Sequence, residues 1–300
     1  MLFIFLGEMI GDVAILRGFR KEELVWDGRI GFWGLALGGL GLAISLGVGC
    51  EWERGSLCLA ADAGEMPHLI QTTSLEEDYR AAAKLGLLLT RRASGVEVQE
   101  VFENVLCSCV RIQVEGHYGS GSIYRMLEDE IIVVTNRHVL QYWNEDSYVT
   151  FFNGRTSGGE VLGTSDKADL GFIRIPIDGF TYEELLAFRN IRIPNELKEE
   201  DEMQHFPAEG SKIFMVNIAS KWNEPIMTEG EILANLMYLE DFGMEMLYAK
   251  GEAIPGMSGG GVFDRSGNYL GMLTGATLQN ELAAVPAKII YEEFHKFNLT

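Results

Sequence analysis

Three short motifs carry a histidine, an aspartate and a serine, in that order along the chain. They read Thr-Asn-Arg-His138-Val-Leu, Ala-Asp169-Leu-Gly-Phe-Ile and Gly-Met-Ser258-Gly-Gly-Gly. A serine hydroxyl is a poor nucleophile near neutral pH unless a base within hydrogen-bond reach takes its proton and a carboxylate fixes the tautomer of that base. Histidine suits the role of base because its ordinary pKa lies near the working pH. The motifs therefore predict that His138 activates Ser258 and that Asp169 orients His138.

The local contexts of the base and the carboxylate support this prediction. His138 follows the apolar run 131–134, which predicts a buried strand that delivers the imidazole to a loop edge. Asp169 directly precedes 170–175, which alternates like a second strand. Asp166 is the competing carboxylate, and Asp169 is preferred because it meets the apolar strand directly.

The serine lies in a glycine-dense turn. With side chains missing on both sides, the backbone N–H groups of Gly256 and Ser258 are free to approach a substrate carbonyl. Such donors stabilise the oxyanion of acyl transfer by about 3–4 kcal/mol each. We expect these two amides to form an oxyanion hole.

With these motifs in this order, the sequence resembles the trypsin-like, chymotrypsin-fold serine peptidases, most closely their bacterial members. The stretch Gly119-Ser120-Gly121-Ser122-Ile123 is similar to the strand that precedes the histidine in that family, and the similarity runs from about Glu103 to the C-terminus. The resemblance implies two six-stranded antiparallel β-barrels with the active site between them. It also implies a serine endopeptidase that cleaves protein or peptide substrates through an acyl-enzyme and needs no metal or organic cofactor.

Several residues depart from the pattern of the animal digestive enzymes. Met257 stands where those enzymes carry the aspartate that pairs with a newly cut N-terminus, and no Arg-Ile-Val-Gly-Gly cleavage site is present, so trypsin-type zymogen activation is not expected. Val139 and Ile254 stand where secreted animal members place cysteines, so the barrels are expected to hold without those disulfides. Only 42 residues follow Ser258, and the second barrel uses them, so no PDZ-like module is expected.

The resemblance places the primary substrate pocket on residues before the nucleophile and on the strand after it. The corresponding positions are Glu252, Thr274, Gly275 and Ala276. Glu252 falls where some members carry an acidic pocket floor, which would favour a basic residue before the cleaved bond. An exposed loop glutamate is the preferred interpretation.

Bulk composition limits the classes of partner and fold. The 300 residues are 47% hydrophobic, enough for a sizeable core, and their net charge of −20 argues against nucleic-acid binding because phosphate would be repelled. Four cysteines are too few for a disulfide scaffold. Cys107 and Cys109 lie two apart on an expected strand, a spacing awkward for a bridge, and are interpreted as free core thiols.

The N-terminal region contains a candidate membrane segment. Residues 30–50 form an uncharged run of 21 residues, which as a helix is long enough to span a bilayer core. Basic residues are concentrated before this run, which predicts a single-pass anchor with the N-terminus in the cytoplasm and the catalytic region outside. A cleaved signal, a lipid anchor at Cys50 and a buried core helix are the alternatives.

Periodicity predicts the remaining organisation. A helix is expected from Ser74 to about Thr90, a short helix within 94–104, six strands in 110–175, a helical patch at 182–188, six strands in 212–285 and a closing helix at 287–297. The expected division is a cytoplasmic segment (1–29), an apolar helix (30–50), a linker with helical segment (51–104) and the peptidase domain (105–300), with barrels at 105–176 and 211–286.

A second class of function stays open at this stage. The same fold can serve as a catalytically silent binding or sensing module, although such modules usually lose a member of the triad, and all three residue types are present in this chain.

Overall fold

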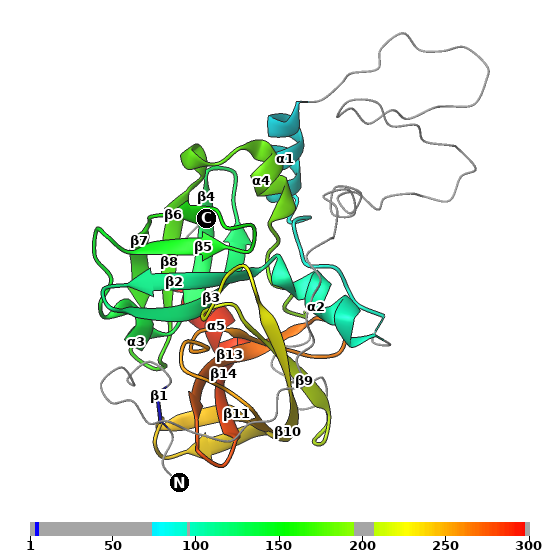
Figure 1. The fold of residues 1–300 in the computed structure, drawn as a ribbon, viewed down its shortest axis with the longest axis vertical. Helices are drawn as coiled ribbons and strands as arrows, with labels where there is room; N and C mark the ends of the chain where they lie inside the picture. Colours follow the sequence, from blue (N-terminus) through cyan, green and yellow to red (C-terminus); the bar gives the residue numbers. More distant parts are fainter. Residues whose placement is uncertain (1–3, 6–73, 95–96, 195–206, 298–300) are drawn as a thin grey trace, which may run out of the picture.

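The computed structural model describes residues 4–5, 74–94, 97–194 and 207–297, and shows two β-sheets that follow one another along the chain and end in a C-terminal helix (Figure 1). The elements in chain order are β1 (Ile4–Phe5), α1 (Leu75–Lys84), α2 (Val98–Leu106), β2 (Cys109–Val114), β3 (His117–Met126), β4 (Glu130–Thr135), α3 (Arg137–Leu140), β5 (Tyr148–Phe151), β6 (Thr156–Ser157), β7 (Glu160–Thr164), β8 (Gly171–Pro176), η2 (Ile177–Gly179), α4 (Tyr182–Ala187), β9 (Lys212–Asn217), β10 (Ile226–Leu239), β11 (Met244–Gly251), β12 (Gly261–Phe263), β13 (Tyr269–Ala276), β14 (Glu281–Pro286) and α5 (Ala287–His295).

The first sheet is an open half-barrel. Its strand order is β6-β5-β2-β3-β4-β8-β7, with every neighbouring pair antiparallel. The prediction of a closed six-stranded barrel is wrong for this half, because β6 and β7 are not paired in the described part of the chain. Strand β6 is two residues long and pairs with β5, and β7 pairs with β8.

The second sheet closes into the predicted six-stranded barrel. Its order is β13-β12-β9-β10-β11-β14, and β14 pairs back to β13. Strand β12 pairs with β13 as far as Met272, and the turn before β12 bonds to Leu273, so the open stretch of β13 on that side begins after Leu273. The two residues of β1 pair antiparallel there, opposite Gly275 and Ala276.

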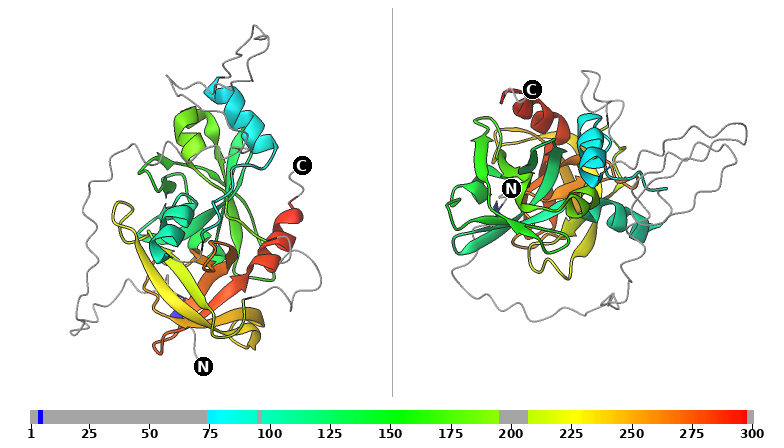
Figure 2. Two further views of the ribbon diagram at one scale, coloured as in Figure 1. Left: turned by 90° about the vertical axis from the view of Figure 1, so that its right-hand side faces the viewer. Right: turned by 90° about the horizontal axis from the view of Figure 1, so that it is seen from above.

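One apolar cluster lies within the first sheet, and a second, larger cluster joins the core of the second barrel to the Tyr124, Val134 and Phe172 side chains of the first sheet. Helix α5 packs where the two sheets meet (Figure 2). Residues 131–135 of β4 are buried without interruption, as the apolar run predicted. Although α5 follows the last strand of the second barrel, its Phe294 ring lies 4.5 Å from the Tyr124 ring and 5.1 Å from the Phe172 ring of the first sheet. These aromatic contacts hold the two halves together.

The helical segment before the sheets is shorter than expected. Helix α1 has a capping box at Ser74 and Glu77 but ends at Lys84, since Gly86 adopts a φ of +64°. The chain then runs extended, and Leu89 bridges to Asn190 beside the first sheet.

The two described cysteines carry free thiols. Cys107 caps the C-terminal end of α2 and is not on a strand, whereas Cys109 begins β2. Burial raises the pKa of the Cys107 thiol to about 11, and raises that of Cys109 as well. Both thiols are therefore protonated and unreactive near neutral pH.

The predicted membrane segment, residues 30–50, lies outside the described residues. Among the helices of the described ranges, none combines the length and the apolar character needed to cross a bilayer.

Candidate active site

Strand pairing brings the predicted base and carboxylate together. His138 lies on the short helix α3, which starts two residues after β4 ends at Thr135. Asp169 lies two residues before β8, and β8 pairs with β4 so that Gly171 faces Thr135. The loops that carry the two side chains therefore leave the sheet side by side.

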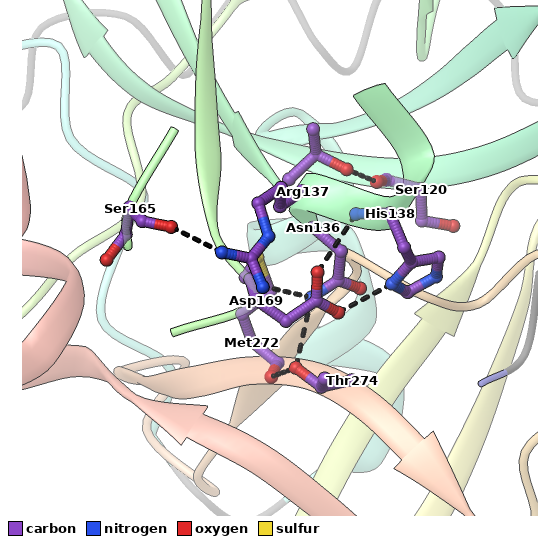
Figure 3. A network of polar contacts seen from close by, with 9 residues as sticks. Ser120, Asn136, Arg137, His138, Ser165, Asp169, Met272 and Thr274 are labelled. Atoms are coloured by element: carbon purple, nitrogen blue, oxygen red, sulfur yellow. Dashed lines mark hydrogen bonds and ion pairs between the residues drawn. The ribbon is translucent and has the colours of Figure 1, made fainter. Parts of the chain in front are cut away.

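His138 and Asp169 make two contacts (Figure 3). The imidazole Nδ1 lies 2.5 Å from Asp169 Oδ2, and the backbone N–H of His138 donates to Asp169 Oδ1 over 2.9 Å. Both side chains are largely buried, with 16% and 10% of their surface exposed. A carboxylate at Nδ1 keeps the proton there, so Nε2 is the basic nitrogen of the ring. The competing Asp166 is exposed and is not part of this contact.

Asn136 joins this pair to the second barrel. It is fully buried, and its Nδ2 donates to the backbone oxygen of Asp169 (2.9 Å) and to Thr274 Oγ1 (3.0 Å) on β13 (Figure 3). Thr274 in turn donates to the carbonyl oxygen of Met272. The role of Asn136 was not predicted from the sequence. The only signal for it was its position two residues before His138.

A second polar chain supports the histidine helix from outside. Arg137 donates to the carbonyl oxygen of Ser165 over 2.8 Å, and Ser165 Oγ donates to Glu293 on α5 over 2.7 Å. The segment that bears His138 is thus tied to the C-terminal helix.

The nucleophile turn lies between β11 and β12 and is bonded to β3 of the first sheet. The backbone N–H of Ser120 donates to the Ser258 carbonyl oxygen (2.8 Å), and Ser120 Oγ donates to the Gly256 carbonyl oxygen (2.8 Å). Thr135 Oγ1 donates to the carbonyl oxygen of the same Ser120 over 2.7 Å. One residue of β3 therefore contacts both the end of β4, which leads to His138, and the turn that bears Ser258.

The turn depends on glycine at two positions. Gly256 and Gly259 adopt φ angles of +92° and +86°, a region that side chains disfavour. A Cβ on Gly259 would lie 2.2 Å from the Ser120 carbonyl oxygen and 2.3 Å from Thr135 Oγ1. This close approach shows how tightly the serine turn packs against the strand that leads to His138.

The reactive groups of the turn have no hydrogen-bond partner among the described residues. Ser258 is 1% exposed, and its Oγ makes no hydrogen bond within the described ranges, so the structure does not join it to His138. The backbone N–H groups of Gly256 and Ser258 also donate no hydrogen bond to any described residue. Catalytic hydrogen bonds are often long in ligand-free enzymes and shorten when substrate binds.

The residues assigned to the substrate pocket lie in different surroundings. Glu252 is exposed, as the preferred interpretation expected, and Thr274 is fully buried against Asn136. Gly275 and Ala276 lie on the edge of β13 that pairs with β1. The described residues contain no cluster of three or more histidine, cysteine or acidic side chains that could hold a metal ion.

The chain was compared with known protein families, curated sequences and solved structures. The sequence profile described as "Trypsin-like peptidase domain" matches residues 119–272, just over half of the chain. Among solved structures, the chain is similar to Rv3671c from M. tuberculosis H37Rv, a serine-to-alanine mutant in its inactive form. The TM-score is 0.52 at 16% identity, with 71% of this chain and 97% of the other covered. At that identity the likeness shows the fold. No curated protein matches the sequence.

The bridge from Asn136 to Thr274 is testable by a double-mutant cycle. We expect Asn136→Ala to lower the free energy of unfolding by about 2 kcal/mol, because two buried acceptors lose their donor. Thr274→Val removes one of these acceptors and should couple to Asn136→Ala by about 1 kcal/mol in urea unfolding. Additive effects within error would show that the two side chains do not interact between the first sheet and the second barrel.

Proposed function

We propose, from the premise that the chain belongs to the trypsin-like peptidase family, that it is a serine endopeptidase acting through an acyl-enzyme on Ser258. The observation that carries the proposal is the doubled contact of Asp169 with His138, beside the turn that holds Ser258. That contact fixes the tautomer and orientation that a general base needs.

The proposed reaction assigns one task to each group. Ser258 Oγ attacks the carbonyl carbon of the peptide bond while His138 Nε2 takes the hydroxyl proton. The proton then passes to the leaving amine, and the amine departs from the acyl-enzyme. Water, deprotonated by the same nitrogen, releases the acid and restores the serine. Asp169 stabilises the imidazolium in both halves of the reaction.

Two further observations support this chemistry. The unused N–H groups of Gly256 and Ser258 are the donors that an oxyanion requires. The edge of β13 at Gly275 and Ala276 accepts an antiparallel strand, as its pairing with β1 illustrates. An extended substrate could add to the same edge through backbone hydrogen bonds, with side-chain selectivity coming from neighbouring pockets.

We further propose, from the sequence, that residues 30–50 anchor the chain in a membrane with the peptidase region outside the cytoplasm. A single crossing would put residues 4–5 and β13 on opposite faces of the bilayer. One molecule therefore cannot both pair β1 with β13 and cross the membrane through residues 30–50. In an anchored molecule β1 cannot reach β13, so this edge of β13 is open to the substrate. The edge is also open if residues 4–5 are removed with a cleaved signal.

Substitution of the triad tests the catalytic proposal. Ser258→Ala and Asp169→Asn should each lower kcat for cleavage of a protein substrate by about 10⁴-fold or more, because the first removes the nucleophile and the second the group that fixes the histidine tautomer. Initial rates of fragment formation from unfolded casein, followed by mass spectrometry, measure the effect.

Asp166→Asn is the matched control, since it neutralises an exposed carboxylate three residues from Asp169. It should leave kcat within about twofold, as for surface substitutions generally. If the parent chain is folded but cleaves no member of a peptide library, the chain is a binding module and not a peptidase.

Fractionation tests the anchor. The full chain should stay in the membrane pellet after alkaline carbonate extraction, and protease added to intact cells should degrade the catalytic region. A variant lacking residues 30–50 should become soluble. Recovery of the parent chain in the soluble fraction, with residues 1–29 still attached, would contradict the topology.

A further inference from the structure

A basic groove lies outside the site described above. It has a volume of about 940 Å³, and its charged lining residues are Arg92, Arg125, Arg192, Lys212, Asp264 and Arg265, which define the arginine groove. None of the triad residues or the oxyanion amides lines it. Its walls come from the extension before α2, β3, the segment after α4, the start of β9 and the turn between β12 and β13.

The charge of the arginine groove is opposite to that of the chain. Five basic side chains line it against one acidic side chain, whereas the whole chain has 24 basic and 44 acidic residues. The one carboxylate, Asp264, is already engaged in its own turn. It accepts from the backbone N–H groups of Ser266 and Asn268 and from Asn268 Nδ2, over 2.8–2.9 Å.

Among the described residues, most of these cations have no anionic partner. Lys212 pairs with Glu229, but in the described ranges no carboxylate lies within ion-pair distance of Arg92, Arg125, Arg192 or Arg265. Burial, and then the nearby charge of Arg92, lowers the pKa of the Arg192 guanidinium. Like charges gathered without a counter-ion disfavour the folded state, and a bound anion would relieve their repulsion.

Two of the guanidinium groups are held in place. Arg192 donates from Nε and Nη2 to the Thr90 carbonyl oxygen over 3.0 and 2.6 Å. The Arg125 guanidinium lies 5.2 Å from the centre of the Tyr124 ring. Fixed, planar forks recognise carboxylates well, because little side-chain freedom is lost when the ligand binds.

We propose that the arginine groove binds an extended acidic segment of a protein partner. The cations come from five separate stretches of chain and line a groove of about 940 Å³, which is more space than a single phosphate fills. Apolar surface from Leu89, Ile193 and Pro194 lies among them. That combination suits a peptide whose carboxylates are spaced along its length.

Peptide binding tests the proposal without any need for catalysis. Fluorescence anisotropy of a fluorescein-labelled peptide of six glutamates is measured with the full chain carrying Ser258→Ala. We expect saturable binding that weakens as salt rises, and no binding of the matching glutamine peptide.

A matched pair of double variants locates the site. Arg92→Gln with Arg265→Gln should raise Kd at least about tenfold, since two charge-assisted contacts are lost. Arg80→Gln with Lys221→Gln removes the same charge from exposed positions elsewhere and should change Kd less than about twofold. Thermal melts of both variants verify folding. Equal effects of the two pairs, or no binding by the parent, would overturn the proposal.

Two other outcomes would also overturn it. Tighter binding of tripolyphosphate than of the peptide would assign the arginine groove to a small phosphate ligand. Residues 199–202 are all acidic. If the parent chain does not bind the peptide but a variant with serine at these four positions does, the chain's own acidic run occupies the arginine groove.

Discussion

The hydrogen bonds of Ser120 are the constraint on which the candidate active site depends. A nucleophile on the second barrel and its base on the first sheet can act together only if the two halves are fixed within a fraction of an ångström. Ser120 holds the serine turn through its backbone N–H and its hydroxyl, and its carbonyl oxygen accepts from Thr135 at the end of β4, the strand that leads to His138. Because these bonds are buried, water does not compete for them, and they hold the turn firmly.

Around this centre, the contacts between the halves fall into two layers. Asn136 forms the inner layer, because it binds the loop of Asp169 and the side chain of Thr274 on β13. The outer layer reaches α5, where Phe294 packs on rings of the first sheet and Glu293 accepts from Ser165. A helix at the end of the chain therefore helps to set the position of a histidine in its middle.

Much of this arrangement could be predicted from the sequence because its signals are local. The apolar run of β4 and the alternation of β8 predicted both strands, and the motif order predicted which residues leave their ends. The open first sheet could not be predicted, since the pairing of its two end strands, β6 and β7, leaves no local signal in the sequence. The helix expected to reach Thr90 stops at Lys84, because Gly86 takes a left-handed conformation.

Contacts between residues that are distant in sequence could not be predicted from the motifs either. Thr274 was assigned to the substrate pocket by resemblance, yet its hydroxyl accepts from Asn136, 138 residues earlier. The arginine groove gathers side chains from five stretches, none of which is strongly basic alone. Such sites become visible only when the fold has placed the stretches side by side.

The central claim is that Ser258 is an activated nucleophile, and covalent labelling tests it most directly. After incubation with a fluorophosphonate, intact-mass and peptide mass spectrometry should find one adduct per chain, located on Ser258. The adduct should be absent from Ser258→Ala and should form far more slowly in Asp169→Asn. A folded parent chain that acquires no adduct, or acquires it equally in Ser258→Ala, would contradict the account.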